Sequence, residues 1–226
     1  SNQKEKLGQA NLKLAGYYAR LGRLSDALAA NRQAGHWIKD GSDDQLRLLL
    51  NAARIYREQG EIERSLEIFA RLQALITATS PVELAAETAY QRGYTRLQAS
   101  RLDQALEDFR ESEKLYRQTE RRNAVILSQK AQASVLSSLG KIAEAEAIYL
   151  ALLEKVKDNP DLKGDINNAL AFLYSETGQY DKALDYSRTA EKAWQKTQQK
   201  QRIPEVLNTR GLIYLKMNYF VQAEIS

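Results

Sequence analysis

The side chains best suited to chemistry in this chain are cations placed at helical spacing. Arg47, Arg54 and Arg57 are seven and three residues apart, which brings them close together on one helix. A second set recurs every four residues late in the chain and continues into a basic segment: Arg188, Lys192, Lys196, Lys200 and Arg202. Such cations bind carboxylates or phosphates through charge-assisted hydrogen bonds. The second set fits an acidic partner, but it is also typical of the solvated outer face of a helix, which we favour.

Residue types needed for catalysis or metal binding are scarce. His36 is the only histidine and the chain has no cysteine, so neither a histidine-based nor a thiolate metal site can be assembled. The glycines are dispersed along the chain and form no phosphate-binding loop. No nucleophile stands in a pattern with a base and an orienting partner. We therefore expect a protein that is not an enzyme by itself and that needs no cofactor.

Charge and hydropathy narrow the class of partner. The net charge of +4, from 33 basic and 29 acidic residues, does not indicate a nucleic-acid partner. No apolar run reaches the length needed to cross a bilayer, and the mean hydropathy of −0.54 suits a chain with much solvated helix surface. We expect a cytoplasmic protein, and the periplasm is equally tolerated by a chain without cysteine.

One short pattern, repeated six times at intervals of 38 to 40 residues, indicates the elements that position these side chains. Each copy has a turn residue, and the six turn residues are Gly22, Gly60, Ser100, Gly140, Gly178 and Asn218. Five positions after each turn comes a small residue: Ala27, Ser65, Ala105, Ala145, Ala183 or Ala223. Repetition at this period indicates units that are too small to bury an apolar face alone and must stack on their neighbours.

Each unit is predicted to be a helix, a tight turn and an antiparallel helix, because apolar residues between turns are spaced by three and four. The first helices are predicted at 4–20, 43–59, 82–98, 122–138, 161–176 and 203–216. The second helices are predicted at 24–39, 62–78, 102–119, 142–157 and 180–198, with a stub from residue 220. Seven positions before each turn lies a residue small enough for a close helix crossing: Ala15, Ala53, Gly93, Ala133, Ala171 or Gly211.

The order small, aromatic, Gly, apolar, Ala resembles the tetratricopeptide repeat (TPR), most clearly in the fifth unit at Ala171, Tyr174, Gly178, Tyr180 and Ala183. The third unit departs from the pattern, with Arg96 for the aromatic residue and Ser100 for the glycine. The resemblance implies an all-α fold: a right-handed α-solenoid of about six stacked helix-turn-helix repeats, the last truncated, in a single domain over 1–226. The predicted repeats are 4–40, 43–79, 82–120, 122–158, 161–200 and a partial 203–226.

The first helices line a concave groove in TPR proteins, so the resemblance also implies which side chains face a ligand. The candidate peptide-binding residues are Arg47, Arg54, Arg57, Tyr90, Tyr94, Lys130, Asn168, Phe172 and Asn208. Arg and Tyr are favoured interface anchors, and an Asn amide both donates to and accepts from a peptide backbone. The alternative is that Tyr90 or Phe172 only packs on the neighbouring repeat. Some family members bind a C-terminal carboxylate on these helices, which Glu87 would repel here.

Units of this length resemble those of kinesin light chains and of bacterial regulators. The hypothesis is therefore a protein- or peptide-binding scaffold or sensory module, part of a larger bacterial signalling or transcription-regulatory protein. Two alternatives stay open: a structural array that sets spacing or self-associates, and a regulatory arm of a catalytic module outside this chain. Self-association would give a homodimer through the uncapped C-terminal repeat, where Phe220 and Ile225 are apolar.

Overall fold

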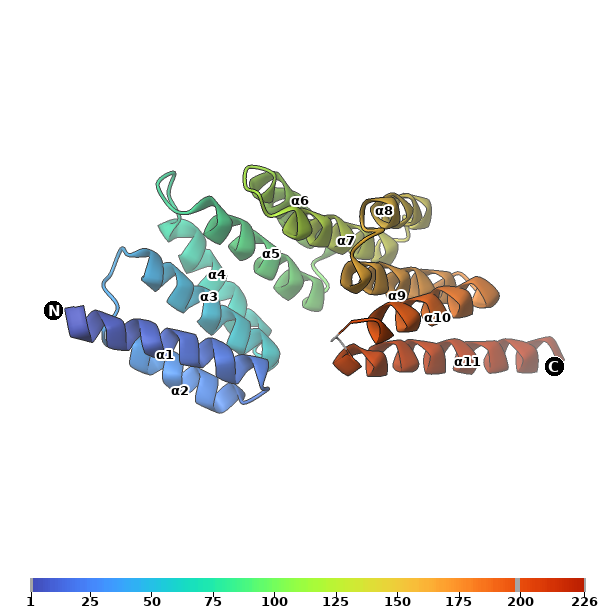
Figure 1. The fold of residues 1–226 in the computed structure, drawn as a ribbon, viewed down its shortest axis with the longest axis horizontal. Helices are drawn as coiled ribbons and strands as arrows, with labels where there is room; N and C mark the ends of the chain where they lie inside the picture. The colour runs from blue at the N-terminus through green and yellow to red at the C-terminus, as the bar shows by residue number, and fades with distance from the viewer. Residues whose placement is uncertain (1, 198–199, 226) are drawn as a thin grey trace. The chain divides into compact units, whose positions relative to one another are not determined.

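The computed structural model describes residues 2–197 and 200–225, and every regular element among them is helical. Figure 1 shows these elements in chain order. They are α1 (Asn2–Arg20), α2 (Leu24–Gly35), α3 (Asp43–Glu58), α4 (Ile62–Leu75), α5 (Val82–Gln98), α6 (Leu102–Tyr116), α7 (Arg122–Ser138), α8 (Ile142–Lys155), α9 (Pro160–Glu176), α10 (Tyr180–Gln195), the 3-10 turn η1 (Lys200–Arg202) and α11 (Ile203–Ile225). The predicted all-α fold of consecutive helix pairs is confirmed.

The turns within the pairs lie where the repeat predicts them. Gly22, Gly60, Gly140 and Gly178 have φ angles of 72°, 81°, 77° and 74°, in the left-handed region that glycine enters without a steric penalty. Ser100 takes the same conformation, with φ 57°. The third repeat therefore keeps the turn geometry of the other four repeats although it lacks the glycine.

The helices form two compact units, residues 1–128 and 129–226, and α7 contributes to both. The repeat spacing runs through residue 128 unchanged, so the sequence does not mark this division. The single domain over 1–226 stays a prediction. Each unit has a buried apolar cluster of its own.

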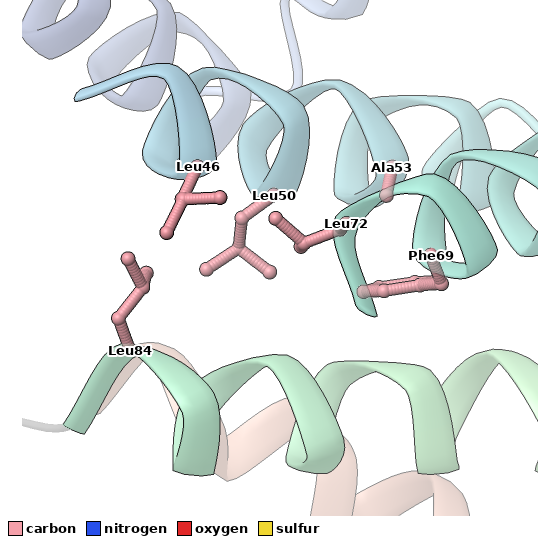
Figure 2. Packing of buried hydrophobic residues seen from close by; sticks show 6 residues of the cluster. All are labelled: Leu46, Leu50, Ala53, Phe69, Leu72 and Leu84. Atoms are coloured by element: carbon pink, nitrogen blue, oxygen red, sulfur yellow. The ribbon is translucent and has the colours of Figure 1, made fainter. Parts of the chain in front are cut away.

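The core of the first unit joins one helix pair to the next. Leucines and an alanine at helical spacing on α3 meet residues of α4 and α5, as Figure 2 shows. The cluster consists of Leu46, Leu50, Ala53, Phe69, Leu72 and Leu84. None of these side chains is more than 7% exposed. The apolar face of α3 is thus covered by its own partner helix and by the next pair, as expected for stacked repeats that cannot bury an apolar face alone.

Small residues allow the two helices of a pair to approach closely. The Ser65 hydroxyl donates to the Ala53 carbonyl oxygen at 2.8 Å, and both residues are fully buried. At Gly93, an added Cβ would lie 2.8 Å from Cε1 of Phe109, closer than real carbon contacts allow. The predicted close-approach positions therefore pack as the repeat implies in the first unit.

The second unit has a tryptophan at the centre of its core. Trp194 on α10 is fully buried against Ala190 and Val206. Its indole N–H donates to the Asp161 carbonyl oxygen at 3.3 Å, near the start of α9. Gly164 leaves the room for this ring, because a Cβ there would lie only 2.3 Å from the indole nitrogen.

The sixth sequence repeat differs from its prediction. The predicted turn at Asn218 and a second helix from residue 220 are wrong, because α11 continues without a break from Ile203 to Ile225. Asn218 stands where four of the other five copies have a glycine in the left-handed conformation, and a side chain makes that conformation costlier than continuing the helix. The Phe220 and Ile225 side chains, predicted to take part in self-association, lie outside the described residues. The second helices of the other five repeats also end two to four residues earlier than predicted.

Candidate peptide-binding site

A cleft of about 640 Å³ opens between the first helices of the first two pairs, α1 and α3. Its lining combines cations, amides and apolar side chains. The residues that matter here are Gln9, Leu12, Lys13, Gly16, Arg20, Asp44, Arg47, Leu50, Asn51 and Arg54. Two of them, Arg47 and Arg54, belong to the predicted binding set. The structure thus places part of the predicted groove in a real concavity.

The rim of this cleft is basic. Arg47 pairs with Asp44 at 3.2 Å, and its side chain remains 50% exposed. Arg54, Lys13 and Arg20 have no carboxylate within ion-pair distance among the residues that the structure describes. With one acidic side chain against four cations, the cleft carries an excess of positive charge. It therefore favours anionic groups of a ligand.

The floor of the cleft is apolar and firmly held. Leu12 and Leu50 are 8% and 5% exposed, so their upper surfaces face the cleft while their bodies belong to the core. Gly16 has open space around its missing side chain, which gives a ligand access to the α1 backbone. The Gln9 amide donates to Asp44 at 2.9 Å and fixes α1 against α3. A basic rim over an apolar floor suits a segment that offers both acidic and apolar side chains.

Arg57, the third arginine of the predicted set, is not among the cleft residues. Its side chain is only 10% exposed and donates to the Gln91 side-chain oxygen at 2.8 Å and to Glu58 at 2.7 Å. Gln91 in turn donates to Glu87, which also accepts from the Tyr116 hydroxyl at 2.8 Å. These bonds tie α3 to α5 and α5 to α6. Arg57 therefore supports the framework beside the cleft.

The two tyrosines of the predicted set are part of an aromatic cluster within the α5–α6 pair. The rings of Tyr90 and Tyr94 lie edge-on to each other at 5.0 Å, and both contact Phe109, at 5.7 and 5.0 Å. Their hydroxyl oxygens are 3.3 Å apart. Burial raises the pKa of the Tyr90 hydroxyl well above its usual value. Both rings keep part of their surface exposed, and a role as ligand contacts stays a prediction.

The remaining predicted residues lie in the second unit. Lys130 on α7 is 3.7 Å from the Asp165 carboxylate of α9. The side-chain oxygen of Asn168 is buried without a hydrogen-bond partner, while Phe172 is 48% exposed and Asn208 is exposed. Lys130 is therefore held by an ion pair, and Phe172 and Asn208 are accessible. Their part in ligand binding stays a prediction.

Asp165 is a buried carboxylate to which no sequence pattern points. It is 8% exposed and pairs with Arg202 as well as with Lys130. Burial raises the pKa of its carboxyl above the usual range, and the two cations reduce this rise without reversing it. Arg202 also stacks on the Trp194 ring, 4.8 Å from its centroid. The group links α7, α9 and η1 inside the second unit.

The departure of the third sequence repeat from the common pattern has a structural explanation. Arg96, in the place of the usual aromatic residue, donates to Asp108 at 2.9 Å. Asp108 is 2% exposed and also accepts from Arg92 at 2.8 Å. In the fifth sequence repeat the same two positions hold Tyr174 and Tyr186, whose rings stack at 5.3 Å between centroids. An ion pair thus replaces an aromatic pair, and an acidic residue eight positions after the turn was the signal for it.

The residues that the structure describes contain no group of three or more His, Asp or Glu side chains placed to hold a metal ion. None of the helices described is both long enough and apolar enough for a membrane-spanning segment.

Comparisons with known proteins agree with the fold of consecutive helix pairs. A tetratricopeptide repeat model matches residues 164–193, within the fifth sequence repeat, where the pattern is clearest. No curated protein matches the chain in sequence. A kinesin light chain-type protein of Podosopora anserina, built from nearly identical TPR-like repeats, superposes with a TM-score of 0.67 at 17% identity, covering 87% of this chain and 99% of that one.

Two further structures are similar. BtubC (BKLC) from P. vanneervenii has a TM-score of 0.60 at 15% identity, covering 99% of this chain and 87% of that one. YrrB, described as a TPR protein with an unusual peptide-binding site, has a TM-score of 0.53 at 14% identity, covering 89% and 90%. At such identities these likenesses concern the fold. Residues 164–193 match the tetratricopeptide repeat in sequence, and the chain as a whole has the TPR-like fold of consecutive helix pairs.

Proposed function

We propose that this protein is a binding scaffold that holds an acidic segment of a partner protein in the cleft between α1 and α3, without catalysing a reaction itself. The observation that carries the proposal is the cleft: an apolar floor at Leu12 and Leu50 beneath four cations and a single carboxylate. YrrB, similar in fold, is described as having a peptide-binding site. A protein with this fold and such a cleft is suited to gripping a segment of another chain.

The cleft also indicates what the partner segment looks like. Its cations attract carboxylates at the rim, while the floor accepts one or two aliphatic side chains. Among the described residues, no carboxylate pairs with Arg54, Lys13 or Arg20, so these are the cations from which an acidic group of a ligand would gain most. The segment therefore combines acidic residues with Leu, Ile or Met between them, in an extended or helical form.

The test is a titration with fluorescein-labelled peptides that alternate Glu with Leu, followed by fluorescence anisotropy. Arg54→Glu should weaken binding by about tenfold or more, since losing one desolvated charge contact costs about 1.4 kcal/mol or more. Arg71→Glu on α4 is the matched control, because it changes the net charge equally at an exposed position outside the cleft. Equal weakening by both variants would discredit the cleft as the site.

A second variant tests the floor without changing charge. Gly16→Leu places an aliphatic side chain where a Cβ meets no atom within 4 Å, so the helix tolerates it and the cleft is filled. Gly211→Leu on α11 is the control, because that glycine also has open space around it and lies in the other unit. Binding should be lost in the first variant and kept in the second. Undiminished binding to the Gly16→Leu protein would place the ligand elsewhere.

We further propose that this binding serves regulation, with the chain acting as the cytoplasmic sensory or scaffolding part of a larger bacterial signalling or transcription-regulatory protein. The support is the long repeat period of 38 to 40 residues, which resembles that of bacterial regulators. Deleting this segment from the complete gene product should remove ligand dependence from the output activity. An output that responds equally with and without the segment would exclude this role.

One observation favours self-association as a second function. Leu207, Tyr214 and Leu215 on α11 are 49%, 50% and 55% exposed, and they line up at helical spacing with Gly211, whose absent side chain would meet nothing. In α1, α3, α5 and α9 the corresponding face packs on the helix that follows in the chain. A second copy of α11 could cover this face. Sedimentation velocity over a range of concentrations tests this: a dimer that Leu215→Glu abolishes would support it, and a monomer at all concentrations would exclude it.

A further inference from the structure

A second cleft, entirely within the second unit, lies between the start of α9 and the end of α10. Its volume is about 350 Å³. The residues that give it its character are Lys157, Asp158, Lys163, Thr189, Lys192 and Lys196. They come from the segment after α8, from the first turn of α9 and from the last turns of α10. The fold thus gathers four lysines, distant in sequence, around one concavity.

These lysines are poorly neutralised by the protein. Among the residues that the structure describes, Asp158 is the one acidic residue that lines the cleft. Lys157 pairs with Glu154 at 2.6 Å, but both side chains are largely exposed, and such pairs contribute little. Lys163, Lys192 and Lys196 have no carboxylate within ion-pair distance in the part of the chain that the structure describes. Like charges held together in a concavity raise the local potential and attract anions.

The other cations of the late basic set are used elsewhere, which separates Lys192 and Lys196 from them. Arg188 pairs with Asp185 at 3.0 Å on the exposed side of α10. Arg202 pairs with Asp165 and with Glu205, the latter at 2.9 Å. The hypothesis of a solvated outer face therefore suits Arg188, whereas Lys192 and Lys196 join lysines of other elements.

The buried core holds this arrangement in place. Trp194 lies between Lys192 and Lys196 in sequence and is fully buried, with its indole N–H bonded to the Asp161 carbonyl oxygen. Gly164, next to Lys163, admits the ring. The backbone positions of the lysines on α9 and α10 are therefore fixed relative to each other before any ligand binds. Such preorganisation lowers the entropy cost of binding.

We propose that this lysine cleft is a second docking surface, for a short run of acidic residues in a partner protein. Lysine ammonium groups are mobile point charges that suit several carboxylates without demanding one planar geometry. The volume of about 350 Å³ accommodates a few side chains. A nucleic acid backbone would instead call for cations extended along a track, and these four are gathered at one spot.

The experiment is a titration of the whole chain with a short fluorescein-labelled oligoglutamate peptide at low and at physiological salt. We compare Lys192→Glu/Lys196→Glu with Lys182→Glu/Arg188→Glu. Both double variants lie on α10 or at its C-cap and change the net charge equally, but only the first alters the cleft. The expected result is at least tenfold weaker binding for the first and less than a twofold change for the second. Binding by the unaltered protein should also weaken as salt is raised.

Three results would overturn the proposal: no binding of the peptide by the unaltered protein, equal weakening by the two double variants, or tighter binding of duplex DNA than of the peptide at matched total charge. Far-UV circular dichroism of each variant guards against misfolding. If Lys192→Glu/Lys196→Glu unfolds, then Lys163→Gln, which removes one charge near the surface, replaces it with the same expected direction. The tenfold weakening by Lys192→Glu/Lys196→Glu should persist in an Arg54→Glu background, so this proposal and the proposed function can fail separately.

Discussion

Replacing Gly164 by Ala tests the packing account of the second unit most directly. An added Cβ would lie 2.3 Å from the indole nitrogen of Trp194 and 2.6 Å from its Cδ1. Ordinary contacts begin at about 3.4 Å, so the ring or the α9 backbone must shift by roughly 1 Å. Trp194 is fully buried and its N–H is bonded to Asp161, so it has no free direction in which to move.

The expected magnitude is the difference between two opposing effects. Overfilling a well-packed core costs about 1–3 kcal/mol, and a shift of this size in a buried tryptophan belongs at the upper end. Replacing glycine by alanine inside a helix stabilises by about 1 kcal/mol. The net change should therefore be a destabilisation of about 2 kcal/mol. For a chain of this length it lowers the Tm by roughly 4–8 °C.

The assay is urea and thermal unfolding followed by far-UV circular dichroism, with tryptophan fluorescence as a second probe. Gly211→Ala is the matched control: it is also a helix glycine of the second unit, but its added Cβ meets no atom within 4 Å. This control should be unchanged or more stable by up to about 1 kcal/mol. If both variants gained stability equally, the close approach of Trp194 to α9 would be refuted.

Three further predictions concern charge, turn geometry and pH. Asp108→Asn should destabilise the chain by about 3 kcal/mol, because it removes the buried carboxylate that pairs with both Arg92 and Arg96 and leaves Glu111, which is 49% exposed, to pair with Arg92. Asp185→Asn at an exposed pair should change the free energy of urea unfolding by less than about 0.5 kcal/mol; similar losses would contradict the burial of the first pair. Ser100→Gly should stabilise by about 1 kcal/mol by relieving a left-handed non-glycine residue, and Gly60→Ala should destabilise similarly; thermal unfolding that ranks them in the opposite order would be inconsistent with these φ angles. Because burial raises the folded-state pKa of Asp165, its carboxyl favours folding below the ordinary value of about 4 and loses that contribution as the pH rises through the raised pKa. The stability of the wild-type chain relative to Asp165→Asn should therefore fall over this window in urea unfolding at each pH, and a relative gain would show that the neighbouring cations outweigh burial.

Much of the fold was predictable because it depends on local signals. The turn at Gly60 needs a left-handed residue, and the close crossing of Ala53 and Ser65 needs small side chains, so both are written in single residues. Hydrophobic spacing of three and four then places the helices. The exception was Asn218, where the pattern predicted a turn that α11 does not make.

The site was only partly predictable, because a helix position does not say which neighbour takes up a side chain. Arg54 and Arg57 are one helical turn apart, yet the first lines the cleft and the second is held by Gln91 and Glu58. Lys13 and Arg20 join the cleft from another helix and were not singled out. Their contribution depends on the distance between α1 and α3, which packing sets.

The sequence alone determined that this chain is a series of helix pairs, because a repeated turn and a repeated small residue dictate local geometry in every copy. The tertiary structure decided which cations are free to bind: among the described residues, Arg54, Lys163, Lys192 and Lys196 have no carboxylate within ion-pair distance, whereas Arg202 and Arg57 are engaged by partners far away in sequence. The physical reason is that charge pairing depends on distances between elements, and those distances are fixed only when the apolar faces pack.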